Sequence, residues 1–376
     1  MKILHIGKFY PIRGGVEKVM LDITAGLSAR GIDCDMLCAS ASGGPRTVRL
    51  NPHGSIFAVR TLRKMYATMI SPAMIWRLRR IAGRYDIIHI HHPDPMAALA
   101  LRLSGFRGKV VLHWHSDILR QKKLLRLFRP LQDWLIARAD TIVGTSPAYI
   151  AHSPWLTGVQ HKCVCVPIGI RPIPMPDVEK VEALRDSFPG KKIVLALGRL
   201  VGYKGFEFLV DSAQYLPDDY VIVIGGDGPL RESLQQRIDS QHLGDKVKLA
   251  GFVADEDLPV YFYASSLFCL SSVERTEAFG VVQIEAMSCG MPVIATEIPG
   301  SGVAWVNAHG RSGLNVPPRN PVALAAAIVA ATASANMHRT YRRGARLRYE
   351  EIFTETDMLD NILNVYNTIL SHTETN

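Results

Sequence analysis

The sequence lacks an apolar run long enough to cross a bilayer or to act as a secretory signal. Only five residues separate Lys2 from Lys8, and arginine or proline interrupts the longer apolar runs that follow. A spanning helix needs about 20 consecutive apolar residues, and a signal peptide needs an apolar core of about 7–15 residues. We therefore expect a chain that is neither exported nor membrane-spanning.

Cysteine pairs with metal-binding or redox spacing are also missing. The six cysteines include no C-x-x-C pair and fall in apolar, strand-like segments, which favours a reducing cytoplasm. The composition is 48% hydrophobic and 20% charged, and this excludes an intrinsically disordered chain. A length of 376 residues is enough for two or three domains.

Acidic residues are scarce in the first part of the chain. Residues 1–169 carry 24 lysines and arginines against 9 acidic residues, whereas the remainder carries 19 against 25. The stretches Arg60–Arg84 and Leu119–Arg138 alternate basic and apolar residues at helical spacing, a pattern that suits an anionic membrane surface. A solvated basic face is the main alternative. Nucleic acid is disfavoured as a partner because the chain has no nucleic-acid module signature.

Short apolar runs alternate with helical patterns in both parts of the chain, as in DIIHI, KVVLHW, KIVLALG and YVIVIGG. This rhythm predicts an α/β protein with parallel sheets and crossover helices. Four prolines between Val166 and Pro176 indicate a linker. We expect one Rossmann-like domain over 1–168, a second over 169–350, and a helix within 351–376 that packs back on the first. Ligands of such domains bind at strand carboxyl ends, here in a cleft between the two.

Two glycines follow the first predicted strand. Gly14 and Gly15 precede a helix that we expect to start near Val16, whose free N–H groups can hold an anion or a sugar hydroxyl. A plain strand-to-helix turn is an equal alternative. The spacing is not G-x-G-x-x-G, which argues against dinucleotide binding.

Histidines at two strand ends suggest a metal site. His89, His91 and His92 lie in one run, and His113 and His115 in another. Alternation along a strand places His89 and His91 on one face and His92 on the other, so we expect no convergence on a metal. His115, followed by a polar turn, is the better candidate for contacting a substrate, and a purely structural histidine remains the alternative.

Four charged residues stand out in the second part. Arg199 follows a predicted strand and Lys204 lies in the first turn of the next helix, so the two could clamp a diphosphate. A surface salt bridge is the alternative, and the pattern is not a P-loop. Glu277 precedes a helix that begins near residue 279 or 280, and Glu285 lies among its apolar residues, where a carboxylate needs a partner or ligand hydroxyls. Paired carboxylates for glycoside hydrolysis fit less well.

Taken together, these residues resemble retaining glycosyltransferase family 4, whose fold is GT-B. The likeness runs from Ile3 to Thr296 and is specific as a set. Its motifs are Gly14-Gly15-x-Glu17, His115-Ser116-Asp117, Pro167-x-Gly169, Gly198-Arg199 with Lys204, Gly226-Asp227-Gly228-Pro229, Glu277-Ala278-Phe279-Gly280 and the segment from Glu285. The chain departs at Ile168, where the family commonly has asparagine in the hinge between the domains.

The resemblance implies that the second domain binds a nucleotide-diphosphate sugar and that the first binds the acceptor. The implied catalytic residues are His115, Arg199, Lys204 and Glu277. The implied donor-binding residues are Gly14, Gly15, Gly198, Arg199, Lys204, Gly226, Gly228, Phe252, Val253, Glu277, Ala278, Phe279, Gly280 and Glu285. The implied acceptor-binding residues are Glu17, Ser116 and Asp117. Within these sets, Glu285 would hold the ribose, Arg199 and Lys204 the diphosphate, and His115 the transferred sugar.

The resemblance further implies transfer with retention, without a metal, a cofactor or a covalent enzyme intermediate. It favours GDP-mannose as donor and an undecaprenyl-diphosphate-linked glycan as acceptor, in synthesis of bacterial O-antigen, capsule or exopolysaccharide. We therefore expect a cytoplasmic protein, peripheral at the inner face of the cell membrane. The alternatives are a UDP-sugar donor, a nucleotide-sugar 2-epimerase on the same fold, and a basic protein that binds lipid or nucleic acid without catalysis.

Overall fold

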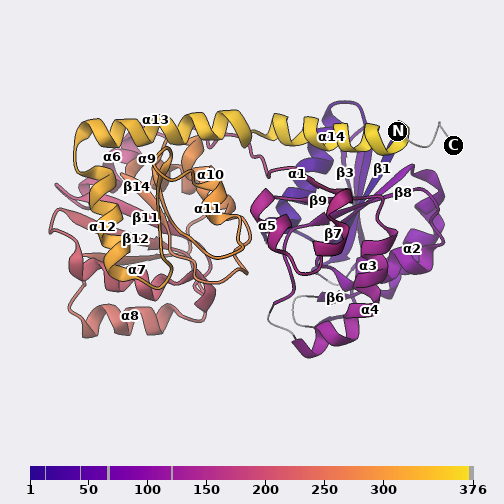
Figure 1. Ribbon diagram of the computed structural model, residues 1–376, viewed down its shortest axis with the longest axis horizontal. Coiled ribbons are helices and arrows are strands. Elements are labelled where there is room, and N and C mark those ends of the chain that lie inside the picture. The colour runs from indigo at the N-terminus through magenta and orange to yellow at the C-terminus, as the bar shows by residue number, and fades with distance from the viewer. Residues whose placement is uncertain (13, 43, 66–67, 120–121, 372–376) are drawn as a thin grey trace. The chain divides into compact units, whose positions relative to one another are not determined.

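The chain folds into two compact units, shown in Figure 1 for a computed structural model that describes residues 1–12, 14–42, 44–65, 68–119 and 122–371. Unit 1 comprises residues 1–168 together with 355–376, and unit 2 comprises residues 169–354. Each unit is an α/β domain built around its own sheet. The predicted α/β class with two Rossmann-like domains is confirmed.

Unit 1 contains an eight-stranded sheet in the order β10-β9-β8-β7-β1-β2-β4-β3, parallel except for the β3–β4 pair. Its strands are β1 (Lys2–Tyr10), β2 (Asp33–Ser40), β3 (Arg46–Asn51), β4 (Gly54–Val59), β7 (Ile87–His92), β8 (Lys109–Trp114), β9 (Thr141–Gly144) and β10 (Cys163–Cys165). β5 (Arg63–Met65) and β6 (Thr68–Ile70) form a separate hairpin. The helices are α1 (Gly15–Ala29), α2 (Pro72–Ile81), α3 (Pro95–Ser104), α4 (Lys122–Arg138), α5 (Pro147–His152) and α14 (Glu355–Ser371).

Helix α14 returns to unit 1 after the whole of unit 2. Leu359 fills the space beside Gly26 of α1, where a Cβ would come within 2.5 Å of its side chain. Arg30 and Asp360 form an ion pair between the same two helices, and Tyr366 is fully buried. Because this contact is apolar at its centre, α14 contributes to the core of unit 1.

Unit 2 contains a six-stranded parallel sheet in the order β13-β12-β11-β14-β15-β16. Its strands are β11 (Lys192–Leu197), β12 (Tyr220–Gly225), β13 (Val247–Gly251), β14 (Leu267–Leu270), β15 (Val293–Thr296) and β16 (Gly313–Val316). Its helices are α6 (Val178–Asp186), α7 (Phe206–Ser212), α8 (Arg231–Ser240), α9 (Leu258–Ala264), α10 (Val281–Ser288), α11 (Val303–Val306), α12 (Pro321–Thr332) and α13 (Ala335–Ile352).

Both sheets change winding direction once. In unit 1 the chain leaves β1 toward β2 and later resumes at β7 on the other side of β1. In unit 2 it leaves β11 toward β12 and resumes at β14 on the other side of β11. Loops diverge at such a switch point, which makes the carboxyl ends of β1 and β7, and of β11 and β14, the places where each unit can hold a ligand.

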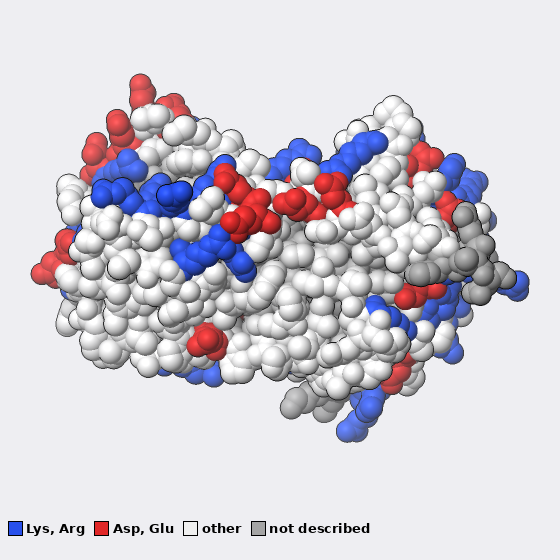
Figure 2. All heavy atoms as spheres, turned by 45° about the horizontal axis from the view of Figure 1, so that its top comes forward, with Lys and Arg blue, Asp and Glu red and all other residues white. Residues whose placement is uncertain are grey.

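Helices α12 and α13 differ strongly in composition. α12 is apolar throughout, whereas α13 carries five arginines, four of which, Arg339, Arg342, Arg343 and Arg346, are exposed. Figure 2 shows basic side chains gathered on part of the face that it presents, and the exposed arginines of α13 give unit 2 a basic patch although its net charge is negative. No single helix in the described part of the chain has the length and apolarity needed to cross a bilayer, and the pair α12 and α13, which meets those criteria together, is bent by 99°.

Candidate functional site

An ion pair occupies the switch point of unit 2. Lys204 follows β11 and Glu277 follows β14, and Nζ of Lys204 lies 2.5 Å from Oε2 of Glu277. Both side chains are only 12% exposed. The sequence predicted that Lys204 lies in the first turn of a helix, and this prediction is wrong. Lys204 ends a short 3-10 turn, Gly202–Lys204, which Gly205 in the left-handed region separates from α7.

The surroundings keep Lys204 charged. Burial is the largest single effect and lowers the pKa of Lys204, but Glu277, Tyr203 and Glu285 together raise it by more, so the pKa lies above its usual value. The Ser272 hydroxyl donates to Oε2 of Glu277 over 3.0 Å, and the Ser271 hydroxyl donates to the Lys204 carbonyl over 2.9 Å. The pair is therefore a fixed cation and a fixed carboxylate at the carboxyl end of the sheet.

Glycines bring the loops after β11 and β12 into backbone contact. A Cβ on Gly226 would lie 1.9 Å from the carbonyl oxygen of Gly198, and one on Gly228 would lie 2.6 Å from that of Leu200. The side chain of Lys204 crosses Gly198, where a Cβ would come within 3.3 Å of its Cε. Only residues without a side chain allow this approach, so the glycine motifs of the sequence form one continuous floor.

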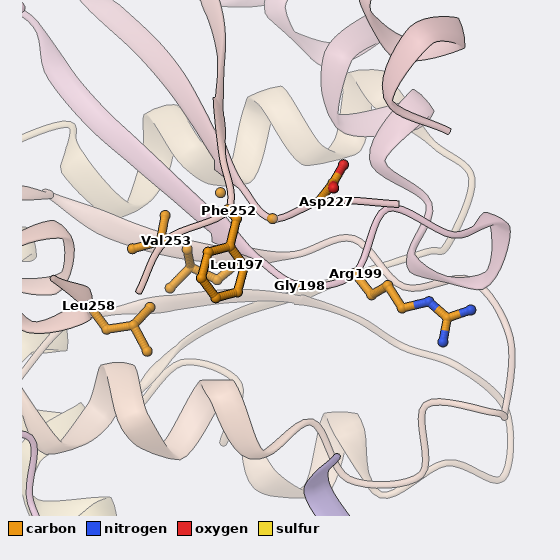
Figure 3. Close-up of a pocket in the computed structure, with 9 residues that line it drawn as sticks. Leu197, Gly198, Arg199, Asp227, Phe252, Val253 and Leu258 are labelled. Carbon is orange, nitrogen blue, oxygen red and sulfur yellow. The ribbon is translucent and has the colours of Figure 1, made fainter. Parts of the chain in front are cut away.

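A cavity of about 290 Å³ opens on this floor (Figure 3). It is lined by Leu197, Gly198, Arg199, Gly225, Gly226, Asp227, Phe252, Val253 and Leu258. Phe252, which is 79% exposed, lies with Val253 and Leu258 at the apolar end, and the guanidinium of Arg199 extends away from that end. Five predicted donor residues, Gly198, Arg199, Gly226, Phe252 and Val253, are thus brought together in one cavity.

The segment from Glu277 to Gly280 is held rigidly. Ala278 and Phe279 are buried, and Phe279 packs edge-to-face on Phe353 with ring centroids 5.9 Å apart. Gly280 has a φ of 77° and precedes α10, which begins at Val281, one residue after the expected start. Glu285 lies within α10 and is partly buried. Both predicted carboxylates of this segment therefore belong to well-supported backbone.

In unit 1, the predicted glycine turn follows β1 and the polar turn follows β8, and β7 lies between these two strands in the sheet. Gly14 is the N-cap of α1, and the buried Glu17 folds back toward it, so that a Cβ on Gly14 would lie 2.4 Å from Oε2 of Glu17. Ser116 is partly buried. Oδ1 of Asp117 accepts hydrogen bonds of 2.8 Å from both Trp114 and Ser153, which fixes the turn that follows β8.

His89, His91 and His92 do not converge as one set, which confirms the prediction, but two other groups of histidines do. Ring nitrogens of His5, His89 and His91 lie within 4.8 Å of one another, and so do those of His91, His113 and His115. β7 lies between β1 and β8, so histidines from three strands meet on one face. The expected alternation is confirmed, since His92 points to the other face and stacks on Trp114 at 3.9 Å between ring centroids.

Burial keeps these histidines neutral. It lowers the pKa of His5, His92 and His113 to about 3 and that of His115 well below its usual range. A neutral imidazole has one donor and one acceptor nitrogen. His115 therefore offers hydrogen bonding to a substrate rather than positive charge.

Lys8 was not predicted as a site residue. It lies within β1, at the irregularity near the carboxyl end of this strand, with a φ of 56°. Its backbone N–H donates to the Asp94 carboxylate, and its Nζ donates to the Pro93 carbonyl over 2.5 Å. Its charge also contributes to lowering the pKa of His115. The only signal in the sequence was a lysine close after the first apolar run.

Comparisons with known proteins agree with this arrangement. The family model of glycosyltransferase family 4 matches residues 13–172, and that of glycosyl transferases group 1 matches residues 179–348. The chain is 32% identical to the O-antigen chain mannosyltransferase C of Escherichia coli, over 98% of this chain and 99% of that protein. It is also 32% identical to the D-rhamnosyltransferase WbpZ of Pseudomonas aeruginosa, over 94% and 92%.

Solved structures share the fold. The crystal structure of Anabaena Alr3699/HepE in complex with UDP superposes with a TM-score of 0.79 at 21% identity, covering 98% of this chain and all of that one. Sucrose-phosphate synthase from Thermosynechococcus elongatus superposes with a TM-score of 0.78, also at 21% identity, over 99% and 100%. Given the near-complete match to curated relatives, the chain belongs to glycosyltransferase family 4 and has the GT-B fold.

Proposed function

We propose that this glycosyltransferase transfers mannose, with retention, from GDP-mannose to a lipid-linked glycan during synthesis of a bacterial surface polysaccharide. The observation that carries the proposal is the buried Lys204–Glu277 pair beside the cavity that holds Arg199, because it sets a cation for a diphosphate next to a carboxylate for sugar hydroxyls. Support for the sugar and the pathway comes from the names of the two relatives that are 32% identical.

The donor fits the unit 2 site in one orientation. The base packs against Phe252 and Val253, the ribose hydroxyls reach Glu285, and the diphosphate reaches Arg199 and Lys204. Donor binding replaces the contact between Lys204 and Glu277, so that Lys204 turns to phosphate and Glu277 to the sugar. An ionised carboxylate has two acceptor oxygens and can therefore take hydrogen bonds from two sugar hydroxyls.

The reaction breaks the bond between the anomeric carbon and the phosphate oxygen and forms a bond to the acceptor oxygen on the same face. Lys204 and Arg199 stabilise the negative charge that develops on the departing diphosphate, and each such donor contributes ~3 kcal/mol in a dry site. The departing phosphate oxygen takes the proton of the acceptor hydroxyl. His115 contacts the transferred sugar as a neutral group, while Glu17, Ser116 and Asp117 serve the acceptor side.

The acceptor places the protein at the cytoplasmic face of the membrane. On α2, Trp76 is 65% exposed and Arg79 and Arg80 follow at the next helical turn. An exposed aromatic ring with basic neighbours suits a surface of anionic lipids. Tyr66, Ala67, Arg120 and Gln121, which belong to the two predicted basic stretches, lie outside the described residues.

The donor is tested by thermal shift with GDP-mannose, UDP-glucose and ADP-glucose, followed by turnover with a lipid-linked acceptor. A ligand at 100 times its Kd stabilises by ~2.7 kcal/mol, so GDP-mannose should raise the melting temperature most. Lys204→Ala should lose this shift and all turnover. Lys192→Ala is the matched control, because Lys192 lies at the opposite end of β11, paired with Asp219 at 3.0 Å. A shift with UDP-glucose alone would overturn the choice of donor.

Metal independence has its own test. Since Lys204 and Arg199 supply the positive charge for the diphosphate, turnover should persist in EDTA. Loss of activity on chelation that magnesium or manganese restores would contradict this part of the proposal.

A further inference from the structure

Five buried histidines share one face of the unit 1 sheet. His5 lies on β1, His89 and His91 on β7, His113 on β8, and His115 directly after β8. The register places His5 opposite His89 and His91 opposite His113. All five are 5% exposed or less. Five imidazoles in an apolar interior need a physical account, because buried polar groups are costly unless they are hydrogen-bonded.

Hydrogen bonds connect four of these rings in a chain that passes through Tyr366 of α14 and ends at His89. Nε2 of His115 lies 2.9 Å from Nδ1 of His91, and Nε2 of His91 lies 2.8 Å from Nδ1 of His5. Nε2 of His5 lies 3.3 Å from the hydroxyl of Tyr366, which lies 2.6 Å from Nδ1 of His89. Tyr366 is thereby linked through three strands to His115.

The hydrogen bonds between these rings must all run in the same donor-to-acceptor direction. Each neutral ring donates through one nitrogen and accepts through the other. If His5, His91 and His115 all carry their proton on Nδ1, His115 presents an N–H beyond the chain. In the reverse direction the protons lie on Nε2, and His115 presents a bare nitrogen instead.

The far end of the chain favours the first direction. Nε2 of His89 is buried and has no hydrogen-bond partner among the described residues. In the first direction this atom is a bare nitrogen, whereas in the second it is an N–H without an acceptor. Among buried backbone groups, an N–H without an acceptor is rarer than an acceptor without a donor, and we apply the same preference to this ring.

We propose that the hydrogen-bonded chain of His5, His91 and Tyr366 fixes His115 as a neutral hydrogen-bond donor through Nδ1, which can then serve an oxygen of the transferred sugar. His5, His91 and Tyr366 are positioning residues, because they act through His115. The identity of the oxygen rests on the proposed function, whereas the chain and its direction do not.

The direction is read directly by NMR of the full-length protein labelled with ¹⁵N-histidine, without any donor sugar. We expect His5, His91 and His115 to carry their ring proton on Nδ1. Tyr366→Phe should leave His5 and His115 as mixtures of both forms. Tyr349→Phe is the matched control, since Tyr349 is equally buried but donates its hydroxyl proton to Ile170 in unit 2 over 2.9 Å. It should leave the histidine spectrum unchanged.

Turnover gives the second readout. Tyr366→Phe should lower kcat about fivefold to tenfold, the size of one net hydrogen bond, with the KM for the donor unchanged. His5→Gln keeps a donor and an acceptor and should retain more activity than His5→Leu. Ring protons on Nε2 of His115 in the unmodified protein, or an unchanged spectrum in Tyr366→Phe, would overturn the proposal.

Two further outcomes are decisive. Stoichiometric zinc in the purified protein, with His5, His89 and His91 as ligands, would overturn the proposed hydrogen bonds because those nitrogens would then bind metal. If the ring protons are found on Nδ1 and GDP-mannose does not bind, the proposed direction of the hydrogen bonds is supported and only the proposed donor is wrong.

Discussion

At the scale of single residues, Lys204 and Glu277 show how an unliganded site can be kept intact. Removing one partner from a buried pair leaves an uncompensated charge, and here the two side chains are 12% exposed and 2.5 Å apart. Each therefore holds the other in the absence of a ligand, and in the proposed function a diphosphate and a sugar replace this contact. The Ser271 hydroxyl connects the two loops through the Lys204 carbonyl, and the Ser272 hydroxyl holds the Glu277 carboxylate within its own loop.

His115→Ala is expected to reduce turnover far more than donor binding. Its side chain belongs to unit 1, whereas the proposed contacts with base and diphosphate all belong to unit 2. We expect kcat to fall by ~10²-fold, as for loss of one well-placed donor, with little change in the KM for the donor. Steady-state kinetics check this. His152→Ala provides the control, because His152 is exposed and bonds only locally to the Ala148 carbonyl. Equal losses in both variants would contradict the role of His115.

At the scale of elements, the contact between the loops after β11 and β12 is the most demanding feature of the donor site. Gly226→Ala places a methyl group 1.9 Å from a backbone oxygen at a φ of 138°. We expect a loss of about 2–4 kcal/mol in unfolding free energy and loss of donor binding, measured by urea unfolding and thermal shift. Gly244→Ala, which meets no atom within 4 Å, should behave as the unmodified protein. A stable, donor-binding Gly226→Ala protein would show that the two loops are not fixed.

We predict that the protein binds membranes through α2 and the turn that follows it. Arg77 is unsuitable for testing it because its guanidinium lies over the Phe57 ring at 4.8 Å. Replacing the exposed Arg79, Arg80 and Arg84 by Gln should release the protein from anionic vesicles, since each basic residue contributes ~1 kcal/mol at such a surface. Sedimentation with vesicles at low and high salt measures this.

The control removes the same charge elsewhere. Arg339, Arg342 and Arg343 are exposed on α13 of unit 2 (Figure 2), and their replacement by Gln should leave vesicle binding nearly unchanged. If both triple variants lose binding equally, net charge rather than α2 is responsible.

The elements also show what a sequence can predict. The apolar runs ending in Leu197, Gly225 and Leu270 became β11, β12 and β14, because a strand buried on both faces has a continuous apolar signal. The cavity residues around Gly198 and Gly226 were predictable because each follows such a run directly.

The neighbours of a strand are set by packing and leave no local signal. This is why the meeting of His5 with His89, and of His91 with His113, was not predicted. The antiparallel pair β3–β4 and the hairpin β5–β6 were missed for a related reason, since both are short and several of their residues are exposed.

At the scale of the whole molecule, the buried histidines make stability depend on pH. Six of them, His5, His89, His91, His92, His113 and His115, have pKa values lowered by burial, to about 3 for His5, His92 and His113. Their ordinary pKa is 6.5. Below that value the unfolded chain binds protons that the folded chain does not, so stability falls with falling pH, by ~1.4 kcal/mol per pH unit for each histidine.

We therefore expect the urea midpoint of unit 1 to stay constant above pH 7 and to fall steeply between pH 6 and pH 5. In that range, protonation of six histidines in the unfolded chain lowers the free energy of unfolding by as much as the whole stability of a domain, ~5–15 kcal/mol. His113→Leu should flatten this dependence at little cost, because neither ring nitrogen of His113 has a hydrogen-bond partner among the described residues. His152→Gln, at an exposed site, should leave the pH dependence unchanged. A midpoint that is equal at pH 7 and pH 5 would contradict the account.

The return of α14 to unit 1 fixes the order in which the two units are completed during synthesis. Met358, Ile362 and Tyr366 of α14 are buried in unit 1, yet the ribosome makes them only after residues 169–354, which form the whole of unit 2. The unit that starts first therefore finishes second, against the usual N-terminal-first order. Until α14 emerges, the nascent unit 1 has an open apolar face, and His5 and His89 lack their tyrosine hydroxyl. Only a chain that has already made unit 2 can complete the support of His115.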